Sequence, residues 1–347
     1  MNKALQTETK IDVHKSVKDI LNTIDRERER EIISRRFGLY DRKETLEQIG
    51  ELLGITRERV RQLEKAIIAR LKAQSEDGLP HIAEIERHFI NELTEMGDAA
   101  RLKHLAQRVT DEGNDRDVAH VAFLSTLSPG LVVLDENDQY HHSVGIGSPN
   151  SQKEVKTKVD KVVEAISNIG KPVTAHELNK SIAYDSSSHV TAYASLSKQL
   201  ANLKDMWGLI KWPTVNPKNI RDKIYVILQE TNKPMHFSEI SEAIKGSDFK
   251  RKDVTTQAIH NELIKDKRFV LIGRGIYALK EWGYKKGTVA DTITEILAKE
   301  GGPLHRDEIV KRVLKHRQVK ETTILLNLQG KPQFKRVAKA TYDLAEA

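Results

Sequence analysis

A short proline motif occurs three times in this 347-residue chain and indicates a repeated small module. Its copies cover residues 170–178, 232–240 and 301–309, and their prolines, Pro172, Pro234 and Pro303, are 62 and 69 residues apart. Before each copy, apolar residues at three- and four-residue steps predict an amphipathic helix. Two shorter helices are predicted after each copy. The three segments are therefore expected to share one fold.

The last two copies end with the same pattern. Residues 269–279 and 334–344 keep Phe, Tyr and Leu at identical offsets, and their alternating apolar residues predict a β-hairpin. In the first copy the second helix is predicted over residues 190–203. The order helix, short strand, helix, helix, hairpin is that of a winged helix. Residues 79–142 are interpreted as a fourth, degenerate copy whose hairpin covers 131–140.

Clusters of Gly, Pro, Asn and Ser between the periodic segments predict domain boundaries. We expect a mostly α-helical protein with small β wings, made of an N-terminal helix-turn-helix and three to four tandem winged-helix modules. The predicted domains are 1–75, an acidic winged-helix-like module at 76–150, and winged helices at 151–216, 217–284 and 285–347.

The charge distribution favours a polyanionic partner. The net charge is +7 and the isoelectric point is near 9.2, which is typical of nucleic-acid binding. Residues 76–150 are the exception, with 14 acidic and 5 basic residues, and are expected to space the modules or to contact a protein. Residues 311–339 carry nine cations and one anion, over the expected recognition helix and wing. We predict phosphate contacts there from Lys315, Arg317, Lys335 and Arg336.

Several classes of protein are disfavoured by what the sequence lacks. There is no cysteine, which excludes disulfides and thiolate metal sites. No apolar run reaches membrane length, and the N-terminus does not have the pattern of a secretory signal. No glycine-rich phosphate loop precedes a helix, and the histidines are scattered. We expect no enzymatic activity, no metal, no cofactor and no membrane association, in a cytoplasmic, nucleoid-associated protein.

The N-terminal segment has the pattern of a helix-turn-helix. Thr45 is a predicted N-cap for one short helix, Gly54 permits a tight turn, and Thr56 is a predicted N-cap for a second helix that extends to about Lys72. At about 100° per residue, one arc of the second helix is polar and the opposite arc is apolar. The polar arc contains Arg57, Glu58, Arg61 and Gln62. These are the side-chain types that recognise guanine, cytosine and adenine edges in the major groove.

This segment resembles region 4 of the sigma-70 family over about 45 residues. The resemblance rests on Arg35-Arg36-Phe37-Gly38-Leu39, Glu44-Thr45-Leu46-Glu47-Gln48-Ile49-Gly50 and Gly54-Ile55-Thr56-Arg57-Glu58-Arg59-Val60-Arg61-Gln62-Leu63-Glu64. It implies recognition of the upstream promoter hexamer and docking on the flap of RNA polymerase. It also implies base contacts by Arg57, Glu58, Arg61 and Gln62, and phosphate contacts by Arg28, Thr45 and Arg59. Because only about 25 residues precede the motif, we expect the regions that melt the promoter to be missing.

Residues 217–284 resemble the HARE-HTH domain, a winged-helix family that includes the N-terminal domain of the RNA polymerase delta subunit. The resemblance rests on Pro234-Met235-His236-Phe237-Ser238-Glu239-Ile240, on residues 260–269 and on Gly273-Arg274-Gly275-Ile276-Tyr277-Ala278-Leu279. Delta-type members bind polymerase rather than DNA, whereas reading of DNA, including modified DNA, has been proposed for other members, so the ligand stays open. Lys250, Arg251, Lys252 and Arg274 are candidate phosphate contacts.

Three functions are compatible with these observations. The leading prediction is a DNA-binding transcription factor or RNA polymerase accessory that reads a promoter-like duplex. The first alternative is an adaptor that docks on RNA polymerase, with incidental DNA affinity. The second is a non-catalytic DNA-sensing component of a defence or modification system.

Overall fold

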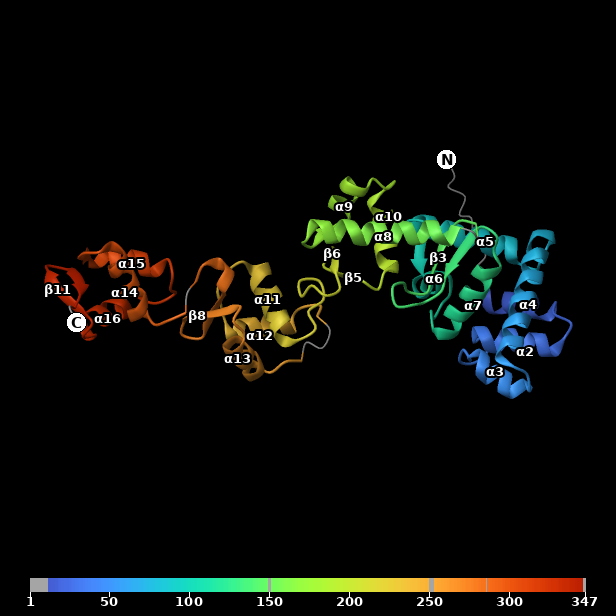
Figure 1. Cartoon of the computed structure of the whole chain (residues 1–347), viewed down its shortest axis with the longest axis horizontal. Coiled ribbons are helices and arrows are strands. Elements are labelled where there is room, and N and C mark those ends of the chain that lie inside the picture. The colour runs from blue at the N-terminus through green and yellow to red at the C-terminus, as the bar shows by residue number, and fades with distance from the viewer. Residues whose placement is uncertain (1–11, 149–150, 250–252, 285, 346–347) are drawn as a thin grey trace, which may run out of the picture. The chain divides into compact units, whose positions relative to one another are not determined.

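The computed structural model describes residues 12–148, 151–249, 253–284 and 286–345, which form two compact units, Met1–Lys211 and Trp212–Ala347 (Figure 1). The described chain is mostly helical with small antiparallel sheets, which confirms the predicted fold class. None of its described helices is long and apolar enough to cross a bilayer.

The first unit begins with four helices and continues with two mixed α and β segments. The opening helices are α1 (Val13–Asn22), α2 (Glu27–Phe37), α3 (Leu46–Leu53) and α4 (Arg57–Asp77). The next segment contains α5 (Ile82–Met96), β1 (Ala99–Arg101), α6 (Leu102–Val109), α7 (Asp115–Leu127), β2 (Leu131–Leu134) and β3 (Ser143–Ile146). The last contains α8 (Gln152–Ile169), β4 (Val173–Thr174), α9 (Ala175–Ile182), α10 (Ser187–Leu196), β5 (Leu200–Leu203) and β6 (Met206–Leu209).

The second unit repeats the mixed α and β order twice. Its first half contains α11 (Ile220–Thr231), β7 (Met235–His236), α12 (Phe237–Lys245), α13 (Thr256–Lys265), β8 (Phe269–Gly273), β9 (Ile276–Leu279) and a 3-10 turn, η2 (Lys280–Trp282). Its second half contains α14 (Val289–Glu300), β10 (Leu304–His305), α15 (Arg306–Leu314), α16 (Glu321–Gly330), β11 (Phe334–Ala338) and β12 (Thr341–Leu344).

One sheet topology occurs four times. The strand orders are β1-β3-β2, β4-β6-β5, β7-β9-β8 and β10-β12-β11, so the short first strand always pairs with the last strand of the hairpin. In the three proline copies this first strand begins directly after the proline, as the motif predicts. The residue two positions after each proline then caps the next helix with its side chain, and this residue is Thr174, His236 or His305. The motif therefore ends a strand and starts a helix.

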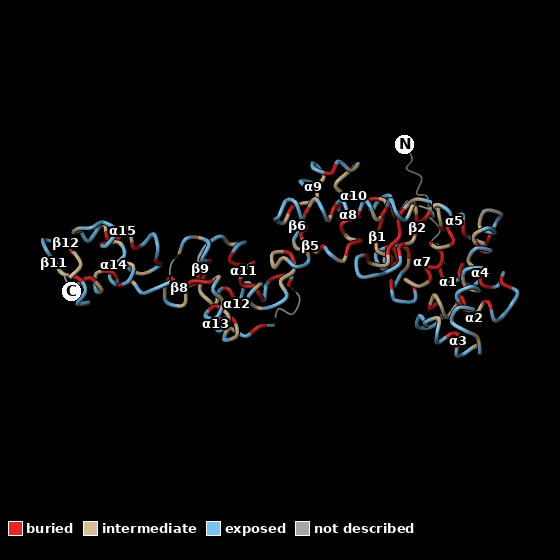
Figure 2. Tube along the Cα trace, in the orientation of Figure 1, coloured by how far each residue is buried: buried red, intermediate tan, exposed pale blue. Residues whose placement is uncertain are grey.

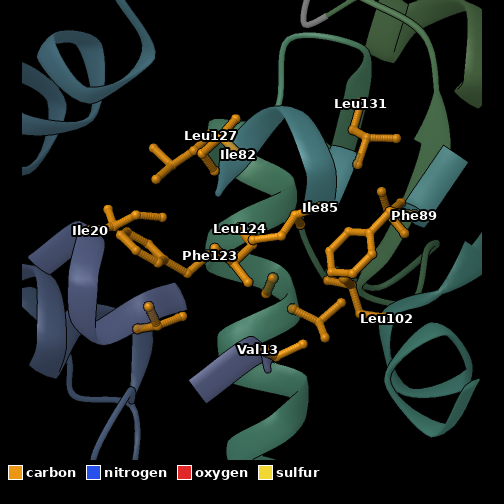
Figure 3. Packing of buried hydrophobic residues seen from close by; sticks show 14 of the residues in the cluster. Val13, Ile20, Ile82, Ile85, Phe89, Leu102, Phe123, Leu124, Leu127 and Leu131 are labelled. Atoms are coloured by element: carbon orange, nitrogen blue, oxygen red, sulfur yellow. The ribbon is translucent and has the colours of Figure 1, made fainter. Parts of the chain in front are cut away.

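A single large core joins the opening helices to the first mixed segment. Val13 and Ile20 of α1, Phe89 of α5 and Phe123 of α7 belong to one buried cluster (Figure 3). Leu71 of α4 belongs to the same cluster. Its buried positions recur along α1, α5 and α7 in the trace of Figure 2. The boundary predicted at residue 75 lies inside α4, and the helix-turn-helix packs directly on the acidic segment. Sequence analysis did not predict α1.

Two predicted elements have different bounds in the structure. The helix predicted over 190–203 ends at Leu196 and is followed by strand β5. Strands β5 and β6 are joined by Lys204 and Asp205, both at positive φ (51° and 61°), a two-residue turn that normally contains Gly or Asn. The hairpin predicted over 131–140 instead pairs β2 with β3, across a longer loop that folds around the side chain of Asn137.

Candidate nucleic-acid interface

The turn between α3 and α4 places the two helices at close range. Gly54 ends α3 at φ 63°, and the Ile55 amide donates to the Gly50 carbonyl at 2.9 Å. Gly50 is buried, and a Cβ atom added there would lie 2.7 Å from the Ile55 carbonyl oxygen. Only glycine therefore permits this approach of backbone to backbone.

Both helices of the motif begin at the predicted caps. The Thr45 hydroxyl accepts from the Gln48 amide at 3.2 Å, and the Gln48 side chain accepts from the Thr45 amide at 2.9 Å. The Thr56 hydroxyl accepts from the Arg59 amide at 3.2 Å. These bonds satisfy amide groups that have no partner within the first turn of a helix. They also fix residue 57 as the first position of α4.

A small apolar cluster sets the rotation of α4. Val60 is fully buried against Ile32 of α2 and Ile49 of α3. With this face turned inward, the four predicted base-reading residues are all exposed. The predicted arrangement of a polar arc opposite an apolar arc is confirmed, and no neighbouring described segment covers the front of α4.

The exposed side chains at the front of α4 form one hydrogen-bonded network. Arg61 donates two bonds to the Glu58 carboxylate, at 2.8 and 2.6 Å, and the Gln62 amide donates to Glu58 at 3.4 Å. Arg59 donates to the Gln62 side-chain oxygen at 3.3 Å. The Arg61 bonds lower the pKa of Glu58 below its ordinary value. The side chains of Arg61 and Glu58 remain 56% and 57% exposed, so the network is accessible to a ligand.

Ion pairs hold the rest of α4 against α2. Arg36 donates to Glu64 at 3.1 Å. Arg70 donates to Glu29 at 2.6 Å, and Glu29 is 7% exposed. The bond from Arg70 lowers the pKa of Glu29. Helix α4 is therefore a fixed part of the first unit.

The structure also shows where the three predicted phosphate contacts of this motif lie. Thr45 is exposed at the start of α3, where its hydroxyl is engaged as the cap. Arg28 is exposed on α2 and donates to the Leu53 carbonyl at 2.6 Å. Arg59 is exposed on α4, beside the four predicted base contacts. All three lie on or next to the helix-turn-helix surface.

One predicted phosphate contact in the second unit is wrong. Arg317 is only 6% exposed and donates to the Leu271 carbonyl at 2.9 Å and to the Thr292 hydroxyl at 3.2 Å. It also donates to the Gly287 carbonyl. Burial lowers the pKa of this guanidinium. Arg317 thus links the segment after α15 to strand β8 and cannot reach a phosphate.

The other predicted contacts of the second unit are more accessible. Arg274 is exposed in the turn between β8 and β9, Lys315 is exposed after α15, and Arg336 is exposed on β11. Lys335 is half-buried. Lys250, Arg251 and Lys252 lie outside the described residues. The predicted cationic recognition helix of the last module is not found, because α16 contains no Lys or Arg and its exposed side chains include Leu326 at 68%. The cations flank that helix instead.

Sequence reasoning missed how the helix-turn-helix is anchored. The His120 ring of α7 makes a 2.7 Å hydrogen bond with the Leu39 carbonyl. The rings of Phe37 and Phe123 pack edge-on with their centroids 5.1 Å apart. Burial lowers the pKa of His120 to about 4, so its ring is neutral at pH 7. Nothing in the local sequence pairs residues about 80 positions apart. The apolar residues of α1 and α7 are the sequence feature that could have indicated this packing.

Comparison with known proteins shows what the N-terminal motif is similar to. Residues 26–73 match the family described as "Sigma-70, region 4". An RNA polymerase sigma factor SigA from a Bacillus species is 43% identical over 60 residues, which cover 17% of this chain and 16% of that relative. The chain thus matches a small part of the curated relative. Residues 26–73 form a helix-turn-helix of the sigma region 4 type, a non-catalytic domain, and this supports a DNA-binding role in transcription.

Proposed function

We propose that the protein is a DNA-binding transcription factor or RNA polymerase accessory that reads a promoter-like duplex with the front of α4. The observation that carries this proposal is the exposure of Arg57, Glu58, Arg61 and Gln62 together at the front of α4, on a helix whose opposite face packs against α2 and α3. Guanidinium, carboxylate and amide groups presented together can distinguish base pairs in the major groove. The similarity to sigma region 4 supports the same assignment.

Phosphate contacts would supply the remaining affinity. Arg28, Thr45 and Arg59 surround the reading face, and Arg274, Lys315, Lys335 and Arg336 are the candidates in the second unit. Each neutralised phosphate releases counterions, so affinity falls as salt rises. We infer that each of the four α–β–α–α–β–β segments is a winged helix, including the degenerate copy predicted at 79–142. The similarity of residues 217–284 to HARE-HTH domains remains part of this proposal.

Selection of duplexes from a random pool tests the proposal. The full chain is expected to enrich a defined motif, and the Arg57→Ala/Arg61→Ala variant is expected to lose that motif while still binding DNA in low salt. A wild-type chain that enriches no motif would contradict sequence reading.

A second candidate is the polymerase-binding adaptor. It is favoured by the lack of cations on α16 and by the exposed Leu326, because a phosphate-binding helix rarely presents a large apolar side chain and no positive charge. Recovery of RNA polymerase with the full chain after nuclease treatment would support it. Loss of that recovery in Leu326→Lys would assign the contact to α16, and recovery that depends on intact DNA would exclude the adaptor.

A further inference from the structure

A groove lies beside α4, within the first unit. Its walls are α4 on one side and α7 with β2 on the other, and its volume is about 860 Å³. Small-molecule sites usually have volumes of about 300–1,000 Å³. A DNA duplex or a folded domain would not enter a groove of this size.

The walls of the groove carry an excess of unpaired positive charge. The side chains of Arg42, Lys43, Lys65, Lys72 and Arg116 line it, and none of them makes a hydrogen bond or ion pair with the described residues. Arg36 and Arg61 also line it, and both are engaged by carboxylates. The acidic residues in the lining are Asp41, Glu64, Asp115 and Asp135. Seven cations therefore face four carboxylates.

Lys72 is a partly desolvated cation of this groove. Its side chain is half-buried, and burial lowers the pKa of its ammonium. A partly desolvated cation without a partner is unfavourable unless an anion compensates for it. At about 100° per residue, Lys65 and Lys72 lie on the same side of α4 as Arg61. The row of cations that begins at Arg61 on α4 thus continues into the groove.

The two walls are held at a fixed separation. The loop that carries Arg42 and Lys43 is anchored by the buried Leu39 and by the bond from His120 of α7 to its carbonyl. Gly38 is at φ 73°, and a Cβ atom there would lie 2.8 Å from the Lys43 nitrogen, so the loop closes tightly on itself. The cations are therefore presented by rigid elements, which favours a preformed site.

The remaining lining matches an organic ligand. Ile68, Val118 and Val133 are partly exposed and provide apolar surface next to the main core. Tyr40 also lines the groove and is 58% exposed, so its ring is available to stack on a planar group. Lysine and arginine side chains are the usual partners of phosphate groups.

We propose that this groove binds a small phosphorylated organic anion of about the size of a nucleoside triphosphate. Its phosphates would contact Lys72, Lys65 and Arg116, and its planar group would lie against Tyr40. This site is separate from the DNA contacts at the front of α4, although Arg61 borders both.

Calorimetric titration of the full chain with inorganic pyrophosphate and with ATP tests the proposal. We expect saturable 1:1 binding of both probes and tighter binding of ATP. Lys72→Gln and Arg116→Gln should each lower the affinity for both probes at least tenfold, whereas Tyr40→Ala should lower the affinity for ATP alone. The matched control is Lys103→Gln, an exposed lysine of α6 outside the groove, which should leave both affinities unchanged.

Three results would overturn the proposal. They are no saturable binding of either probe, equal weakening by Lys103→Gln, or a hexaglutamate peptide that binds this groove more tightly than either probe. Arg116 is exposed, so its variant remains informative if Lys72→Gln fails to fold. DNA selection by Lys72→Gln without added ligand should match the wild type. Failure of the groove and failure of DNA reading are thus distinguishable.

Discussion

Under the proposed function, Arg61 is the residue whose substitution tests base recognition most sharply. It donates two bonds to Glu58, so its guanidinium has a fixed orientation at the front of α4. We expect Arg61→Ala to cost about 1–3 kcal/mol of binding free energy and to relax specificity at one base pair. Binding to a panel of single-base variants of the selected site measures both effects, with Lys103→Gln as the control. An equal loss of binding free energy on every duplex would show that Arg61 contacts a phosphate and not a base.

Glu29 gives the helix-turn-helix a dependence on pH. Its pKa is lowered in the folded chain, chiefly by the bond from Arg70. The stabilisation is therefore complete above the ordinary carboxyl pKa and is lost as the pH falls through the lowered value. We expect Glu29→Gln to reduce the free energy of unfolding by about 1 kcal/mol at pH 7. Urea unfolding should show a smaller difference at pH 3, and an unchanged difference would contradict the assignment.

At the scale of elements, local signals predicted the helix-turn-helix well. Thr45, Gly54 and Thr56 act within their own turns, so their roles could be read from a few adjacent residues. The strand β5 could not be predicted in this way, because its turn at Lys204 and Asp205 has no glycine or asparagine. Arg317 was misassigned for a related reason. A cation in a basic stretch has the pattern of a phosphate contact until its distant partners, Leu271 and Thr292, are known.

The turn between α3 and α4 should be intolerant of a methyl group at residue 50. An added Cβ would lie against the Ile55 carbonyl, a backbone atom that cannot move aside without opening the turn. We expect Gly50→Ala to destabilise the motif by about 2 kcal/mol or more and to abolish DNA selection. Gly54→Ala meets no atom within 4 Å and should cost only about 1 kcal/mol for its left-handed conformation. Thermal unfolding compares the two, and equal losses would argue against a close contact at Gly50.

On the scale of the whole molecule, each unit is held together by contacts that cross the predicted module boundaries. In the first unit one buried cluster includes α1, α4 and α7. In the second, Arg317 and the bond from the Gln318 amide to the Ile272 carbonyl (3.1 Å) tie the last segment to β8. The modules of a unit are therefore not independent domains joined by flexible linkers.

Arg317 and Lys315 should behave differently when substituted. Arg317→Met removes several buried hydrogen bonds, and we expect it to lower the free energy of unfolding by about 2 kcal/mol without changing the salt dependence of DNA binding. Lys315→Gln should leave stability unchanged and reduce the salt slope by about 1. Denaturation and salt titrations on both variants measure these effects. A reduced slope for Arg317→Met would show that its side chain reaches DNA after all.

The central claim is that the front of α4 distinguishes one duplex from another. The most direct measurement is the ratio of affinities for the selected site and for a scrambled duplex, at fixed salt, in the wild type and in Arg57→Ala/Arg61→Ala. We predict a ratio of about 10³ or more in the wild type, falling towards one in the variant, while affinity for the scrambled duplex changes little. A wild-type ratio near one, or a ratio that the double substitution leaves intact, would contradict the account.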